Sequence, residues 1–289
     1  MDPDEIAIGI IAGLLEAHTG QKLTKERKWR IGSALGGMFR ERGITSNQDL
    51  VVLLTQPDQS SLTREVVEAL LNNETYFFRD QKVFDTLATS VLPEIASKRE
   101  AEKRIAIWCC GCSTGQEALS LAMLFAEQRA RWEGWEISIL GTDVSTQVIE
   151  HARRGLYSQF QIQRGLGVAR MLRFFNEQDD GWMANDTLRG MVRFERHNLL
   201  DPPPFPGNFD LVLCRNVLLY FDEATRARAV ARMRAGVSDE GWLLLGGGEA
   251  NIARDSGFRP SERLVSLFRP ETASANRSEM AMARKAQTV

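Results

Sequence analysis

Apolar residues recur at helical spacing from about residue 4 to residue 88. Leu62, Val66 and Leu70, for example, fall on one face of a helix because they lie four positions apart. We therefore expect residues 1–72 to form a small all-helical domain.

Beyond residue 104 the pattern changes to short, continuous apolar runs separated by helical stretches. The runs cover residues 105–110, 137–140, 209–214, 242–245 and 264–268. Continuous apolar strands that alternate with helices are typical of a mostly parallel sheet with helices on both faces. We therefore expect an α/β domain over residues 73–270.

Two segments depart from this alternation. The polar interval 176–196 contains Asp-Gly and Arg-Gly steps, which suggest a small β hairpin inserted into the α/β domain. Residues 271–289 contain no apolar strand and no strong cap, so we expect a disordered tail or a linker.

Composition narrows the class of protein without naming a partner. Of the 289 residues, 43% are hydrophobic and 26% are charged, and the formal net charge is −2. These values are ordinary for a two-domain soluble protein and show no basic excess that would predict binding to nucleic acid. The apolar stretch 6–15 follows acidic residues and is too short for a membrane span, so we expect a cytoplasmic protein without membrane insertion.

Three of the four cysteines, Cys109, Cys110 and Cys112, lie in one apolar segment. Cysteines this close together cannot form the separated disulfides of a secreted scaffold, so we expect reduced thiols. A metal site is the alternative, but there is no second ligand pair with zinc spacing and the three histidines are scattered. We predict no metal.

A strand, a turn containing Gly111 and Gly115, and a helix follow one another within residues 105–124. Such a turn lets a ligand approach bare backbone at the sheet edge where open α/β folds bind nucleotides. Gln116 stands where a P-loop needs lysine, and the third glycine of a dinucleotide fingerprint is missing. The turn favours a nucleoside-like cofactor, while a tight turn without a ligand is the alternative.

Two carboxylates are predicted beside this turn. Asp143 ends the next apolar strand, where an acid can accept hydrogen bonds from ribose hydroxyls, and Glu117 lies in the first turn of the helix. Two acids would repel a pyrophosphate but suit a ribose or a cationic sulfonium, so S-adenosylmethionine fits better than NAD. Alternatively, Asp143 caps the following helix and Glu117 stabilises its own helix dipole.

Two polar residues, Arg215 and Asn216, directly follow the apolar run 209–214. An apolar turn that contains Tyr220 comes next. Polar groups at the end of a central strand point into the cleft of an open sheet. Upstream, the Asp-Pro-Pro-Pro-Phe segment 201–205 superficially matches a signature of amino-directed methyltransferases. It lies before the strand instead of after it, so we interpret it as a rigid loop.

At the predicted domain junction, Asn73, Thr75 and Arg79 interrupt an aromatic cluster within residues 70–80. Small polar side chains and an arginine at a domain boundary are well placed to close a ligand cleft. The alternative is a helix cap together with a surface ion pair.

Four segments together resemble the chemotaxis-receptor glutamate methyltransferases, the CheR family of bacteria, in the same order over nearly the whole chain. The segments are LLNNETYFFRD (70–80), WCCGCSTGQEALSLAM (108–123), GTDVSTQVIEHARRGLY (141–157) and HNLLDPPP with FDLVLCRNVLLYFD (197–222). The resemblance implies a helical receptor-docking domain and a Rossmann-like S-adenosylmethionine-binding domain with an inserted β subdomain. It also implies S-adenosylhomocysteine as product.

The same resemblance implies the site residues. Arg79 and Tyr220 would be catalytic and face the reacting centre. Those implied to surround the cofactor are Asn73, Thr75, Arg79, Glu117, Asp143, Asn198, Leu199, Arg215 and Asn216. A protein glutamate has a pKa of about 4.3, so it is already the nucleophile at neutral pH and needs no general base. The predicted activity is methylation of glutamates on methyl-accepting chemoreceptors to methyl esters, for sensory adaptation.

A basic stretch could dock the acceptor. Residues 22–42 hold seven basic and two acidic side chains, a local net charge of +5. The basic residues are Lys22, Lys25, Arg27, Lys28, Arg30, Arg40 and Arg42. In the resembled family, a basic face of the amino-terminal domain is associated with the acidic methylation helices of receptors; a solvated helix face is the alternative. Gly36 and Gly37 stand where the family is usually richer in arginine, which predicts weaker or different docking.

Other departures leave alternatives open. Ser145 stands where the family commonly has a second acid, and residues 246–250 replace its usual Gly-His-Ser-Glu-like segment. These departures concern the rim of the cofactor site. A methyltransferase with another acceptor, such as a small acid, and a non-catalytic binding module are the rival functions. For the oligomeric state, we expect a monomer.

The interval around Gly181 lacks the Gly-x-Gly step of family members that grip a carboxyl-terminal receptor tether. We therefore predict that a receptor-tail pentapeptide gives no measurable heat of binding in titration calorimetry. Removal of that tail should leave the methylation rate of a receptor fragment unchanged, and a tight peptide complex would contradict the prediction.

Overall fold

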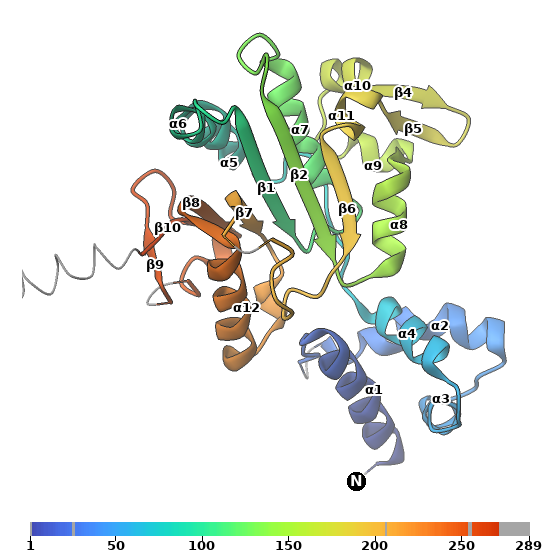
Figure 1. The fold of residues 1–289 in the computed structure, drawn as a ribbon. Coiled ribbons are helices and arrows are strands. Elements are labelled where there is room, and N and C mark those ends of the chain that lie inside the picture. The colour runs from blue at the N-terminus through green and yellow to red at the C-terminus, as the bar shows by residue number, and fades with distance from the viewer. Residues whose placement is uncertain (1, 25–26, 206, 254–255, 272–289) are drawn as a thin grey trace, which may run out of the picture.

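The chain begins with helices that form their own hydrophobic core. Ile11, Leu35 and Val66 are buried where these helices meet. The helices are α1 (Pro3–Thr19), α2 (Arg30–Arg42), α3 (Asn47–Leu54) and α4 (Ser60–Leu70). They lie together below the sheet in the view of Figure 1 and are called the helical part below. This computed structural model describes residues 2–24, 27–205, 207–253 and 256–271.

A seven-stranded sheet forms the centre of the rest of the molecule. Its strands are β1 (Arg104–Cys110), β2 (Glu136–Asp143), β6 (Val192–Arg196), β7 (Phe209–Cys214), β8 (Val237–Leu245), β9 (Phe258–Pro260) and β10 (Leu267–Pro270). The strand order is β6-β2-β1-β7-β8-β10-β9, in which the first five strands run parallel and the last two are antiparallel to their neighbours. This confirms the predicted α/β fold class.

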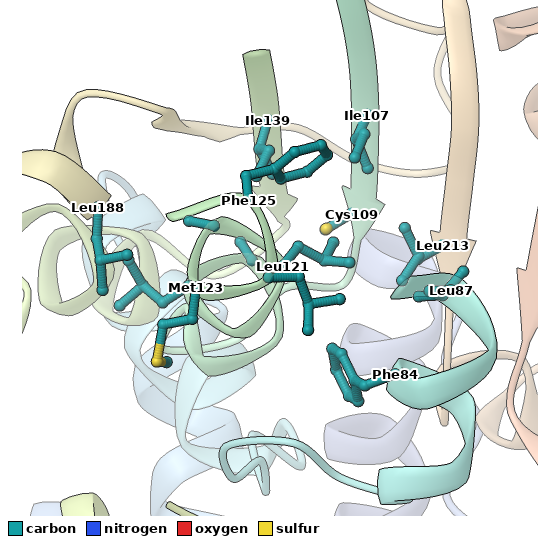
Figure 2. Packing of buried hydrophobic residues seen from close by; sticks show 14 of the residues in the cluster. Phe84, Leu87, Ile107, Cys109, Leu121, Met123, Phe125, Ile139, Leu188 and Leu213 are labelled. Atoms are coloured by element: carbon teal, nitrogen blue, oxygen red, sulfur yellow. The ribbon is translucent and has the colours of Figure 1, made fainter. Parts of the chain in front are cut away.

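Helices cover both faces of this sheet (Figure 1). They are α5 (Gln81–Thr86), α6 (Leu92–Lys98), α7 (Gln116–Glu127), α8 (Thr146–Arg154) and α12 (Glu223–Gly236), with a π-helical turn at Leu87–Val91 between α5 and α6. Alternate residues of β1 point to opposite faces of the sheet. Ile107 packs in the cluster that contains residues of α7, and Trp108 packs in the cluster that contains Met233 of α12. Figure 2 shows part of the first layer, with Leu121 and Phe125 of α7 beside the strands.

A second, three-stranded sheet corrects the predicted limits of the insertion. It has the order β3-β5-β4, with β3 (Leu156–Tyr157), β4 (Phe175–Gln178) and β5 (Gly181–Ala184), and the short helices α9 (Gln159–Gln163), α10 (Val168–Phe174) and α11 (Asp186–Arg189) lie in the same region. The limits 176–196 are wrong at both ends, because β3 joins the small sheet from upstream and β6 pairs with β2 in the main sheet. The sequence did not predict β6 because charged residues interrupt its apolar positions.

Some expectations fall where the structure describes nothing. The predicted tail or linker lies, from residue 272 onward, outside the described residues, as do Lys25 and Glu26 of the basic stretch. Among the helices that are described, none has both the length and the apolar character needed to cross a membrane.

The strand order places a crevice at the carboxyl ends of β1 and β7. The chain continues from β1 to β2 on one side and later adds β7 on the other side, and such a change of direction is where open α/β sheets bind ligands. The register pairs Cys110 with Thr142 and with Cys214. Gly111, Asp143 and Arg215 directly follow these aligned positions, so segments far apart in sequence meet at one edge.

One buried carboxylate joins the helical part to the α/β domain. Glu68 of α4 is only 7% exposed and accepts hydrogen bonds from the backbone N–H groups of Thr146 (2.7 Å) and Gln147 (3.3 Å) and from the hydroxyl of Ser145. These groups belong to the first turn of α8, whose N–H groups find no acceptor within the helix. A carboxylate from α4 therefore caps the first turn of α8, next to the position where Ser145 stands.

We expect Glu68→Ala to lower the free energy of unfolding by about 2–4 kcal/mol, because each buried N–H group that loses its acceptor costs about 1–3 kcal/mol. Urea denaturation measures the loss. Glu65→Ala, on the same helix, is the matched control, since its ion pair with Arg42 is largely exposed and should contribute less than about 1 kcal/mol. Equal losses in the two variants would contradict a bridging role for Glu68.

Candidate active site

A cavity of about 920 Å³, including its open mouth, lies at the carboxyl ends of β1, β2 and β7, where they meet the helical part. Every site residue that the sequence singled out lines it: Asn73, Thr75, Arg79, Glu117, Asp143, Asn198, Leu199, Arg215, Asn216 and Tyr220. The wall also includes Thr19 at the end of α1, Gln21 just after α1, and Asn72 just after α4. The sequence predicted none of these three residues. The predicted residues are therefore brought together, and the helical part shares their cavity.

The turn between β1 and α7 depends on glycine at two positions. Gly111 and Gly115 have φ angles of 66° and 94°, which L side chains rarely adopt. A Cβ atom on Gly111 would lie 2.4 Å from Val217, and one on Gly115 would lie 2.8 Å from Phe194. The glycines allow the turn to pack closely against neighbouring segments, which leaves the backbone of Gly111 and Cys112 on the cavity wall.

Asp143 organises the loops beneath the cavity. Its Oδ2 atom accepts a hydrogen bond from the N–H of Ser113 (2.9 Å), and its Oδ1 atom accepts one from the N–H of Ser145 (3.0 Å). Burial raises the pKa of this carboxyl, although the backbone hydrogen bonds oppose the rise. Each carboxylate oxygen has a second lone pair, so Asp143 can still accept a hydrogen bond from a ligand hydroxyl.

Arg215 forms the most connected group of the site. Its side chain is 1% exposed, and its guanidinium donates to Glu117 Oε2 (2.8 Å), to the carbonyl of Arg79 (2.9 Å) and to the carboxylate of Asp80. Glu117 is therefore ion-paired with Arg215, which offsets the negative charge that the sequence places beside the turn. Within the described part of the chain, Arg215 Nε is buried without a hydrogen-bond partner.

Arg79 and Tyr220 reach the cavity from different segments. The guanidinium of Arg79 lies 5.5 Å from the ring of Tyr76, and its bond to the carbonyl of Glu74 is long, at 3.4 Å. Most of its N–H donors are thus available to an anion. Tyr220 ends a 3-10 turn at Leu218–Tyr220, and its hydroxyl accepts a hydrogen bond from Asn72 Nδ2.

Three other predicted residues, Asn198, Asn73 and Leu199, hold the loops around the cavity or line its wall. The Asn198 amide donates to the carbonyl of His18 (3.2 Å) and accepts from the N–H of Leu200 (3.0 Å), which ties the loop after β6 to α1. The carbonyl of Asn73 accepts from the hydroxyl of Ser113 (2.6 Å). Leu199 is buried in the cavity wall.

Glu249 is a structural determinant of the site that the sequence argument did not identify. It is fully buried and accepts from the N–H groups of Asn216 (2.8 Å), Gly246 (2.9 Å) and Leu219 (3.2 Å). These bonds hold the turn that carries Asn216 and Tyr220. The only signal in the sequence was an acid within an otherwise glycine-rich segment, which spacing alone could not connect to residues 216–219.

The residues of the cavity fit a nucleoside with a cationic centre. Asp143 offers carboxylate lone pairs, and the side-chain oxygen of Asn216 is buried without a hydrogen-bond partner in the described residues. Asn216 has a φ angle of 61°, a left-handed conformation that asparagine adopts more readily than most other residues. A ligand amine or hydroxyl could satisfy the orphan oxygen.

The cysteines beside the turn belong to the core. All four are free and buried, and burial raises the pKa of each thiol. Neutral, buried thiols are poor nucleophiles, so these residues serve packing at the ends of β1 and β7 and not the chemistry of the cavity.

Comparison with known proteins agrees with this geometry. Residues 73–263 match the family model described as "CheR methyltransferase, SAM binding domain". A chemotaxis protein methyltransferase of Vibrio parahaemolyticus is 33% identical over 82% of this chain and 86% of its own length. A chemotaxis protein methyltransferase of Borreliella burgdorferi is 32% identical over 80% and 83% of the two chains, and chemotaxis protein methyltransferase 1 of Pseudomonas aeruginosa is 34% identical over 82% and 87%. The family model matches about two thirds of the chain, and these relatives are 32–34% identical over 80–82% of it. The chain therefore belongs to the CheR methyltransferase family.

Proposed function

We propose that this protein is an S-adenosylmethionine-dependent methyltransferase of bacterial chemotaxis that converts glutamate side chains on chemoreceptors to methyl esters. The observation that carries the proposal is one cavity lined by two sets of groups: the Asp143 carboxylate with the orphan amide oxygen of Asn216, and Arg79 with its free donors. The first set suits a nucleoside with a sulfonium, and the arginine suits a carboxylate acceptor.

The cofactor end of the cavity is assigned to the ends of β1, β2, β6 and β7. We assign the ribose hydroxyls to Asp143, and the remaining contacts to Glu117, Asn198, Leu199, Arg215 and Asn216, together with Asn73 and Thr75. The bound cofactor supplies a methyl group on a positively charged sulfur. Arg215 holds Glu117 and the 79–80 backbone, so it shapes this end of the cavity.

At the acceptor end, Arg79 holds the incoming carboxylate by charge-assisted hydrogen bonds and orients one oxygen toward the methyl group. The bound cofactor would give up its methyl group to that oxygen and leave as the neutral thioether, and Arg79 would hold the oxygen in line with the carbon–sulfur bond. No proton moves, so the site needs no general base. Opposite charges cancel in this step, and Arg79 must therefore orient the carboxylate without binding it too tightly.

We infer that the acceptor docks on the amino-terminal helices, as predicted from the basic stretch, and that the partner is an acidic receptor helix. Arg42 pairs with Glu65, and Lys22 pairs with Glu16 and Asp222, so the free positive charge is smaller than the sequence count. Trp29, which is 72% exposed at the start of α2, offers an aromatic anchor beside this charge.

The cytoplasmic location, the monomeric state, the lack of nucleic-acid binding and the absence of a tether requirement stay predictions. A methyltransferase that acts on a different carboxylate is the second candidate, because the cavity selects a carboxylate and not the protein that carries it. Transfer of a radiolabelled methyl group to a receptor cytoplasmic fragment separates the two. Labelled methanol released by base identifies the product as an ester, and no transfer to any receptor fragment would contradict the proposal.

We expect Asp143→Asn to weaken S-adenosylhomocysteine binding at neutral pH by about 10-fold or more, because a hydrogen bond to a charged acceptor contributes about 1.5–3 kcal/mol. In the wild type, affinity should fall as pH is lowered through the raised pKa of Asp143, since only the ionised carboxylate has all its acceptor positions. Titration calorimetry across pH measures both effects. Asp239→Asn, an exposed acid outside the cavity, is the control, and an unchanged pH dependence in Asp143→Asn would count against the assignment.

Arg79→Ala should lower kcat for the protein acceptor by about 100-fold, because the carboxylate loses its orienting donors. Arg79→Lys keeps the charge but not the planar fork and should fall between the wild type and Arg79→Ala. Initial-rate measurements with a receptor fragment test this. Arg104→Ala, an exposed arginine at the amino end of β1, is the matched control and should keep the wild-type rate. A wild-type kcat in Arg79→Ala would refute the carboxylate role.

A further inference from the structure

The hydroxyl of Tyr220 has a partner outside the motif residues. Asn72, which follows α4 by two positions, directs its Nδ2 atom at Tyr220 Oη, and both residues line the cavity. We propose that Asn72 is a positioning residue that makes Tyr220 a hydrogen-bond donor toward the acceptor carboxylate. This inference rests on the proposed function and deepens it.

The chemistry of the two groups fixes the direction of the bond. An amide NH₂ group can only donate, so the phenolic oxygen of Tyr220 acts as the acceptor. The single phenolic proton must therefore point elsewhere, and no acceptor for it is found among the described residues. A carboxylate entering the cavity would supply that acceptor.

The rest of Tyr220 is held from other sides. The N–H of Lys22 donates to its carbonyl (2.7 Å), and the guanidinium of Arg27 lies 4.9 Å from the centre of its ring. Beneath it, Glu249 anchors the N–H of Leu219. With the backbone and ring restrained, the remaining freedom is rotation of the O–H group, and the bond from Asn72 restricts that rotation.

This arrangement gives the acceptor carboxylate two donors of different kinds. Arg79 supplies charge-assisted hydrogen bonds, and Tyr220 supplies one neutral hydrogen bond from another segment of the same cavity. Two donors on one carboxylate define the plane of the group, which leaves an oxygen lone pair directed along the line of attack. Asn72 acts on the acceptor only through Tyr220.

Three substitutions test the inference. Asn72→Ala should lower kcat for a receptor fragment by about 5- to 10-fold, the effect of a single orienting hydrogen bond, with the Kd for S-adenosylhomocysteine nearly unchanged. Asn72→Asp should lower kcat further, because its carboxylate accepts the phenolic proton and removes it from the acceptor. Tyr220→Phe should cost at least as much as Asn72→Ala.

The decisive readout is the double variant. In the Tyr220→Phe background, Asn72→Ala should cause no further loss of kcat, because no phenolic proton remains to be directed. Asn176→Ala, an exposed asparagine in β4, is the control for an unrelated amide and should keep wild-type kinetics. Thermal unfolding of each variant reports whether the fold is retained.

The possible results separate the inference from the proposed function. Independent, multiplicative effects of the Asn72 and Tyr220 substitutions, or an equal kcat for Asn72→Ala and Asn72→Asp, would overturn the role of Asn72 while leaving the methyltransferase proposal intact. A wild-type protein that transfers no methyl group to receptor fragments would instead refute the proposed function itself.

Discussion

The buried guanidinium of Arg215 is the interaction on which the cavity depends. A cation that is 1% exposed is costly unless it is paired, and here the two terminal nitrogens of Arg215 bond to Glu117 of α7 and to a carbonyl and a carboxylate of the 79–80 segment. Three segments that are distant in sequence are thereby held around one point at the end of β7. Removing the charge would leave Glu117 and Asp80 without their partner, so the geometry of the cavity and its electrostatics are inseparable.

Buried carboxylates repeat this logic in the surrounding loops. Glu68, Asp143 and Glu249 each accept backbone N–H groups from turns or helix starts that have no acceptor of their own. Loops at the carboxyl end of a parallel sheet carry many such orphan donors, and burial makes each unpaired donor costly. The acids hold these loops in one conformation, which is the condition for a cavity that meets its ligand without rearrangement.

The helical part is a component of the cavity as well as the proposed docking surface. Gln21 forms an isolated bridge with Phe221, Asn72 contacts Tyr220, and Asn198 reaches the carbonyl of His18. An acceptor that docks on α2, as proposed, would contact the helical part. The segments that follow α1 and α4 in turn contact Phe221 and Tyr220 at the cavity. Under the proposed function, acceptor recognition and acceptor orientation would be parts of the same structure.

The sequence by itself determined the helical beginning, the central parallel strands and the cavity residues of the recognised motifs. Continuous apolar runs can be buried only between two layers, and residues that follow directly on such strands must meet at one sheet edge. It did not determine β6, whose charged residues alternate with apolar ones, nor the limits of the small sheet. Only the tertiary structure revealed that Glu68 serves α8, that Glu249 holds the Tyr220 turn and that Asn72 faces Tyr220. Each of these contacts joins side chains to groups far along the chain, and no local spacing encodes a partner that only packing brings near.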